Sequence, residues 1–171
     1  MTRPGGGRGR EGAGVTRRTF TAPRFTCRVE YPVDWHIWVG PLPHLELPRQ
    51  VFALSNRSIA VPTGGRGRSR RVVEQLDGDA VLLWVHYRLP EDPDVAVADP
   101  VYYWGTRPDD RDDRQAAGPP VVPSTTLTWR RTGRGGEVSV SALAWEGAHV
   151  APADAGRLHD VIATLAVEFS P

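Results

Sequence analysis

The chain of 171 residues has the length of one domain, and its hydrophobic fraction of 40% and net charge of +1 are ordinary for a globular protein. All 21 basic residues are arginine, which excludes reactions that need a lysine, such as Schiff-base chemistry or phosphate binding by a P-loop. A single cysteine, Cys27, excludes an intramolecular disulfide and a cysteine-based metal cluster.

Residues 1–19 are rich in glycine and arginine and lack apolar periodicity, which predicts a disordered tail. Residues 1–24 carry six arginines against one glutamate, so this region is basic, whereas residues 25–171 are mildly acidic. No apolar segment follows the basic start, and we therefore expect no secretory signal. The longest apolar run, residues 80–85, is far shorter than the ~20 residues that cross a bilayer. These features predict a cytoplasmic protein without a membrane partner.

Residues 20–171 predict a single α+β domain with several strands. Apolar and polar residues alternate strictly from Phe25 to Tyr31, a pattern typical of a half-buried strand. Residues 80–88 are apolar on both faces at their centre, as expected for an interior strand. Shorter patterns predict further strands at residues 35–39, 51–61, 101–104 and 166–169.

The clearest strand pair is a hairpin formed by residues 125–132 and 137–145, with a glycine-rich turn between them. Pairing residue 132 with residue 137 places five apolar side chains on one face: Leu127, Trp129, Val138, Val140 and Ala142. A shift by one residue would mix them with the polar set, so the pattern itself selects this register.

Two helices are expected to pack on the sheet. Ser69 can cap a short internal helix over residues 70–76. The C-terminal helix spans about residues 152–165, begins at a proline, and repeats apolar residues at the spacing of one helical face. Together these elements predict an α+β fold: a mainly antiparallel sheet with a C-terminal helix and a short internal helix packed on it.

Four segments resemble the PsbP-like α/β/α sandwich: the strand leading into YPVDW at 31–35, VLLWV at 81–85, VSVSA at 138–142, and the closing helix at 158–165. The resemblance covers about residues 25–170 and is similar in layout to small uncharacterised actinobacterial domains. It implies a binding or assembly role rather than a reaction, and it transfers no site residues.

Aromatic residues are the most distinctive feature of the sequence. Trp38 has the opposite parity from its apolar neighbours, and Tyr102, Tyr103 and Trp104 are consecutive, so at least one of these three faces away from the buried side. An exposed aromatic surface of this kind favours a protein partner or an apolar pocket. The alternative is a second, covered face of the sheet.

Patterns of catalytic residues are weak. His36 and His86, together with acids in the loops, could serve a small hydrolase or a metal-dependent enzyme, but two histidines without a third ligand are not a metal site. Cys27 shares a face with apolar neighbours, where an inert core cysteine is expected. We therefore expect no catalytic residue, no metal and no cofactor, and favour a non-catalytic binding or assembly module over the enzyme.

A third hypothesis is nucleic-acid binding through arginine-rich segments. Arg66, Arg68, Arg70 and Arg71 lie at the expected start of the internal helix, where backbone N–H groups also favour anions. Together with the tail they could contact phosphates. The stretch lacks interleaved aromatic residues and the body of the chain is acidic, so the sequence favours a protein partner over nucleic acid.

Overall fold

The computed structural model describes residues 14–39, 49–58, 78–91 and 123–171. Of these described residues, 59% lie in strands and 13% in the one helix. The elements in chain order are β1 (Val15–Ala22), β2 (Phe25–Pro32), β3 (His36–Trp38), β4 (Arg49–Ser55), β5 (Val81–Arg88), β6 (Thr125–Gly133), β7 (Gly136–Glu146), α3 (Pro152–Thr164) and β8 (Ala166–Phe169).

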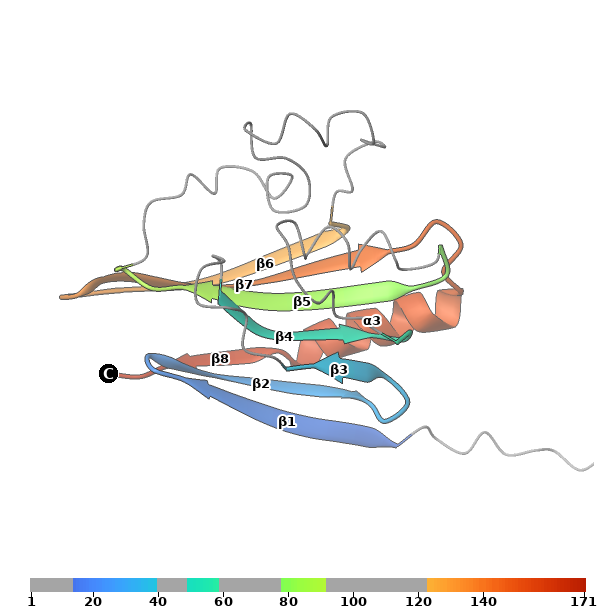
Figure 1. Cartoon of the computed structure of the whole chain (residues 1–171), viewed down its shortest axis with the longest axis horizontal. Coiled ribbons are helices and arrows are strands. Elements are labelled where there is room, and N and C mark those ends of the chain that lie inside the picture. Colours follow the sequence, from blue (N-terminus) through green and yellow to red (C-terminus); the bar gives the residue numbers. More distant parts are fainter. Residues whose placement is uncertain (1–13, 40–48, 59–77, 92–122) are drawn as a thin grey trace, which may run out of the picture.

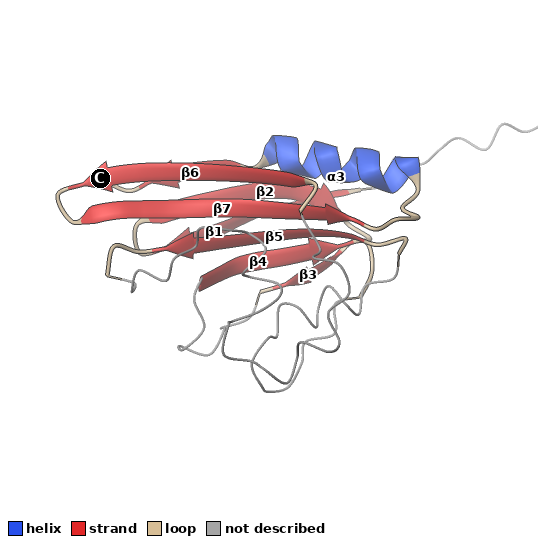
Figure 2. Ribbon diagram, turned by 90° about the horizontal axis from the view of Figure 1, so that it is seen from above, coloured by secondary structure: helices blue, strands red, loops and turns tan. Residues whose placement is uncertain are grey.

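The strands form two antiparallel sheets that lie over each other as two layers (Figure 1). One sheet has three strands in the order β1-β2-β8, and the other has five in the order β3-β4-β5-β7-β6. Seen from above, α3 lies along one side of the layered strands (Figure 2). It packs against β2 of the small sheet and β5 of the large one, so it closes the space between the layers on that side.

The expected α+β fold with two helices on one main sheet is wrong, because the described residues form a mostly β structure with two sheets and one helix. The strand patterns explain the difference. The strict alternation of β2 leaves one of its faces in solvent, whereas β5 is buried on both faces. The two strands lie in different sheets, and each sheet has one face on the shared core. The expected internal helix at residues 70–76 and the expected strand at 101–104 lie outside the described residues.

β1 replaces part of the expected tail, since residues 15–19 are the first five of its eight residues. It pairs with β2 along its whole length, from Val15 opposite Pro32 to Ala22 opposite Phe25. The sequence hides the strand because its residues are mostly threonine and arginine, which suit the solvated edge of a sheet. Residues 1–13 lie outside the described residues.

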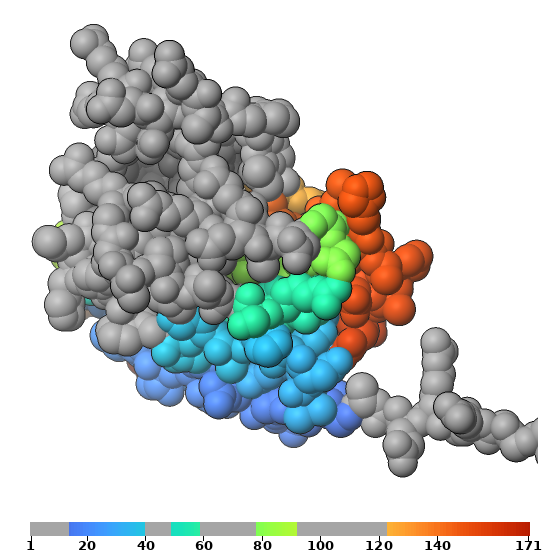
Figure 3. All heavy atoms as spheres, turned by 45° about the vertical axis from the view of Figure 1, so that its right-hand side comes forward, coloured from blue at the N-terminus to red at the C-terminus, as the bar shows by residue number. Residues whose placement is uncertain are grey.

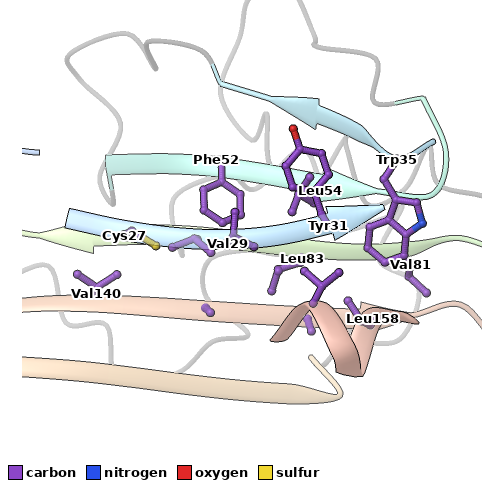
Figure 4. Packing of buried hydrophobic residues seen from close by; sticks show 14 of the residues in the cluster. Cys27, Val29, Tyr31, Trp35, Phe52, Leu54, Val81, Leu83, Val140 and Leu158 are labelled. Atoms are coloured by element: carbon purple, nitrogen blue, oxygen red, sulfur yellow. The ribbon is translucent and has the colours of Figure 1, made fainter. Parts of the chain in front are cut away.

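The main core fills the space between the two sheets and α3 (Figure 4). Phe25, Cys27 and Val29 of β2 face Phe52 and other side chains of the large sheet in this core. Leu158 and Val161 of α3 complete it, as the helical spacing predicted. The hairpin prediction is also confirmed, because Thr132 pairs with Glu137 and all five apolar side chains of that face join or pack against the core.

A threonine side chain joins α3 to the small sheet. The register of β2 with β8 runs to Arg28 opposite Ala166. Two residues further along, the Oγ1 of Thr164 accepts a hydrogen bond from the backbone N of Glu30 (2.9 Å) and lies 3.2 Å from the carbonyl oxygen of Glu30. The hydroxyl also lies 2.8 Å from the carbonyl oxygen of Val161 in the helix, so it gives the backbone N–H of Glu30 a partner at the point where the chain leaves the helix.

Candidate functional site

The outer face of the five-stranded sheet, turned away from the main core, carries a second apolar cluster. It consists of Ala53, Leu82, Trp84, Leu143 and Trp145, with half-buried Trp38 packed against it. No residue of α3 or of the small sheet belongs to this cluster. Trp84 and Trp145 are only 4% and 5% exposed. The sheet is therefore apolar on both faces, which explains the doubly apolar sequence of β5.

Strand pairing arranges the outer face in rows that cross the sheet. One row is Trp38, Ala53, Trp84, Leu143 and Thr126, and the next is Gln50, His86, Ser141 and Thr128. A third row, Arg88, Ser139 and Arg130, lies beyond the second. Along the strands the outer face thus changes from aromatic to polar and then to cationic.

Gln50 links the aromatic row to the polar row. Its Oε1 accepts a hydrogen bond from the indole Nε1 of Trp84 (3.1 Å), and its Nε2 donates to the carbonyl oxygen of Trp38 (3.3 Å). An irregularity in pairing leaves Val51 as an extra residue of β4 between Gln50 and Phe52. Because of this bulge, Val51 packs against the inner core while Gln50 stays on the outer face.

His86 is a buried histidine in the polar row. Its imidazole lies 5.0 Å from the ring of Trp84, centroid to centroid, and the residue is 5% exposed. Burial, together with the smaller effect of the positive charge of Arg88, lowers the pKa of His86 from 6.5 to about 3. The imidazole is therefore neutral at physiological pH.

The structure does not bring the two histidines of the enzyme hypothesis together. His36 pairs with Ser55 and lies in the row of Leu82, two strands away from β5 and four residues along it from His86. Strands spaced ~4.8 Å apart with ~3.4 Å per residue separate the two histidines by roughly 16 Å. They cannot share a metal ion, and none of the described residues form a group of three or more metal-ligating side chains.

Cys27 lies in the main core with no exposed surface. Burial raises the pKa of its thiol to about 11, so the thiol stays protonated at physiological pH. This environment fits the expected core cysteine and not a nucleophile, which needs an accessible thiolate.

Of the aromatic residues expected to form a binding surface, the structure places only Trp38. Its parity is as predicted, because Ile37 packs on the main core and Trp38 on the outer cluster. Tyr102, Tyr103 and Trp104 lie outside the described residues, as do Arg66, Arg68, Arg70 and Arg71. The described residues therefore do not test the expected aromatic surface beyond Trp38, nor the expected anion contact.

A polar network holds the end of the sandwich at which α3 begins. Asn56 accepts a hydrogen bond from the backbone N of Val81 (2.8 Å) and donates to Asp154 (3.1 Å) and to the carbonyl oxygen of Asp79 (3.3 Å). Figure 3 shows these segments side by side on the surface, coloured teal, green and orange. The network ties the first turn of the helix to β4 and β5.

Sequence reasoning missed the arginines at the opposite end of the sandwich. Arg130, Arg131 and Arg134 follow one another through the β6–β7 turn, and all three are exposed. The signal was present in the segment TWRRTGRGGE, in which three of ten residues are arginine and none is apolar except tryptophan. The sequence pattern predicts only a hairpin here, with strands at 125–132 and 137–145 and the turn between them, and no binding role.

Comparison with known proteins found no matching family model, no matching curated protein and no matching solved structure. The PsbP-like resemblance therefore stays a prediction. Within the described parts of the chain, the helix is neither long nor apolar enough to span a membrane.

Proposed function

We propose that this domain is a non-catalytic binding or assembly module that engages a protein partner along strand β3. The observation that carries the proposal is the position of Trp38 at the rim of the outer apolar cluster. The indole is half-buried, whereas Trp84 and Trp145 within the cluster are almost completely covered. A tryptophan at such a rim can be buried further by a partner, and tryptophan is among the residues that contribute most to protein interfaces.

The surroundings of Trp38 support the same surface. Val39 follows it and is 50% exposed, one of three large hydrophobic side chains that are exposed among the described residues. β3 lies at the edge of its sheet and pairs only with β4 among the described strands. An edge strand with an aromatic and an aliphatic side chain can accept an extended segment of a partner.

The test uses two exposed valines that differ only in position. Val39→Asp places a charge beside Trp38, whereas Val33→Asp places the same charge on a side chain that is 63% exposed in the turn before β3. Both variants keep the core intact, because neither valine is buried. Proteins that co-purify with the full-length chain from its native source are quantified by mass spectrometry.

We expect a partner that co-purifies with the wild type and with Val33→Asp. Its recovered amount should fall at least ~10-fold with Val39→Asp, since a buried unpaired charge weakens binding by well over 1.4 kcal/mol. Trp38→Ala should weaken the same contact. Equal retention by both aspartate variants would contradict the proposal, and so would equal loss.

A further inference from the structure

The two ends of the sandwich carry opposite charge. We call the "hairpin end" the end formed by the β1–β2 turn, the start of β4, the end of β5, the β6–β7 turn and the end of β8, at the left of Figure 1. Its charged residues are Arg24, Arg49, Arg88, Arg130, Arg131, Arg134, Glu91, Glu137 and Glu168. The other end, where α3 begins, carries Asp34, Asp79, Glu146, Asp154, Arg57 and Arg157. The hairpin end thus has six arginines and three glutamates, and the other end has four acids and two arginines.

The β6–β7 turn projects from the hairpin end. In both ribbon views its tip reaches past the β1–β2 turn and the end of β5 (Figures 1 and 2). The two strands stay paired to the last residues, Gly133 opposite Gly136, so the tip is a continuous antiparallel ribbon. Arg130 and Arg134 are therefore carried on a defined backbone, and both are exposed.

The arginines at the tip differ from those on the small sheet in having no carboxylate to neutralise them. On the small sheet Arg28 pairs with Glu168 at 2.9 Å, and Arg17 pairs with Glu30 at 2.5 Å. Neither Arg130 nor Arg134 makes an ion pair with any residue that the structure describes. Their charge is available to an external anion.

Two contacts fix the tip relative to the rest of the molecule. Arg131 donates from Nη1 to the carbonyl oxygens of Phe169 (3.0 Å) and Ser170 (2.7 Å), which ties the large sheet to the end of β8. The guanidinium of Arg24 lies against Gly135, so close that a Cβ on this glycine would be 3.1 Å from Nη1. The β1–β2 turn therefore adds a further guanidinium beside the tip.

Of the three glycines of the tip, Gly133 leaves its backbone open, because a Cβ there would meet nothing within 4 Å. Gly136 has a φ of 98°, which an L side chain rarely adopts, and a Cβ there would lie 2.6 Å from Pro90. A phosphate can therefore approach the backbone at Gly133 without displacing a side chain.

We propose that the hairpin end binds the phosphate backbone of nucleic acid through Arg130 and Arg134, with Arg24 beside them, whose guanidinium also lies 3.8 Å from a carboxylate oxygen of Glu91. Guanidinium groups bind phosphate oxygens in a bidentate manner and stay charged at every physiological pH. Several guanidinium groups spread over one projecting ribbon match a polymer with many phosphates better than an isolated carboxylate. This surface is distinct from the β3 edge, and the proposal stands independently of a protein partner there.

The experiment measures binding of the full-length protein to fluorescein-labelled 20-nucleotide DNA and RNA by anisotropy, between 50 and 200 mM salt. Two to three phosphate contacts predict a slope of roughly -2 in log affinity against log salt. The double variant Arg130→Gln/Arg134→Gln should lower affinity by ~10-fold or more and reduce the slope by about 2, because each phosphate contact contributes about 1. Single-stranded and duplex probes distinguish the form of nucleic acid that is preferred.

The control is a charge-matched double variant, Arg17→Gln/Arg28→Gln, which removes the same charge from the small sheet. It should leave affinity within ~2-fold, since these arginines are paired with glutamates. Equal losses in the two double variants would overturn the proposal, because net charge alone would then explain binding. Complete loss of nucleic-acid binding in the triple variant Arg3→Gln/Arg8→Gln/Arg10→Gln would overturn the proposal as well. So would the absence of binding by the wild type, binding that does not depend on salt, or equally tight binding to polyglutamate.

Discussion

The two sheets have the same layout, with one face on the shared core, but their outer faces are opposite in character. The outer face of the small sheet carries threonines and cross-strand ion pairs such as Arg28 with Glu168. The outer face of the large sheet carries Leu82, Trp84 and Trp145, all nearly buried. The small sheet therefore covers one side of the main core, whereas the large sheet has an apolar layer on each of its two faces. The comparison shows that the large sheet is the structural centre of the domain.

The largest expected effect tests whether the outer layer is packed as tightly as the inner one. Trp84→Ala on the outer face should lower the free energy of unfolding by about 3–5 kcal/mol, as much as Phe52→Ala on the inner face, because both remove a large buried side chain. Urea denaturation measures both. Thr26→Ala on the outer face of the small sheet is the control and should change stability by less than about 0.5 kcal/mol. A small loss of stability in Trp84→Ala would show that the outer layer is not packed as tightly as the inner one.

The next effect concerns the buried histidine of the outer layer. The pKa of His86 is lowered to about 3 in the folded protein, so the unfolded chain takes up its proton first as pH falls. The contribution of His86 to the free energy of unfolding is therefore fully present above about pH 6.5 and decreases as the pH falls toward 3. Lowering the pH from 7 to 4.5 should therefore reduce the free energy of unfolding by about 2–3 kcal/mol through this imidazole.

Denaturation of wild type and His86→Gln at the two pH values tests this expectation. The variant should lose that part of the pH dependence, while the same change at exposed His36 serves as the control. An unchanged difference between the two pH values in His86→Gln would show that the outer layer admits a charged imidazole.

A smaller effect tests how the small sheet is attached to α3. Thr164→Val keeps the shape of the side chain but removes the hydroxyl that bonds the backbone of Glu30. It should cost about 1–2 kcal/mol, because a backbone N–H loses its partner. Thr164→Ser keeps the hydroxyl and should retain most of the stability in thermal unfolding. Equal losses in both variants would point to packing instead of the hydrogen bond.

The smallest effect concerns the ion pairs of the small sheet. Arg28→Gln should lower stability by less than about 1 kcal/mol, because the pair with Glu168 is solvated, and 0.5 M salt should remove most of that difference. A loss as large as that of Trp84→Ala would mean that the small sheet depends on its outer face after all.

Local patterns in the sequence predicted the elements whose partners are close in the chain. The hairpin register, the helical face with Leu158 and Val161, and the opposite parity of Ile37 and Trp38 are all confirmed. Each of these follows from side-chain periodicity alone. The short strand at Ala166–Phe169 was also predicted, because its apolar residues follow the helix directly.

The division into two sheets could not be predicted, because it depends on pairs that are far apart in the sequence. β8 joins β2 instead of the strand nearest in the chain, and β1 is too rich in arginine and threonine to be identified from hydrophobicity. The polar row of the candidate site was hidden for a different reason. A single extra residue, Val51, sets which side chains of β4 face outward, and no periodic pattern predicts a bulge.

The attachment of β8 to β2 has a consequence for the order of folding. The side-chain bond between Arg28 and Glu168 joins residues 140 positions apart, whereas the β6–β7 hairpin joins immediate neighbours. Closing so long a loop costs entropy before any contact is gained, and proteins with such distant contacts fold slowly. The β6–β7 and β1–β2 hairpins can form early, and the pairing of β8 with β2 that completes the small sheet forms late. Until then one apolar face of the large sheet is open to water, and this is the interval in which the chain is most exposed to aggregation and to chaperones.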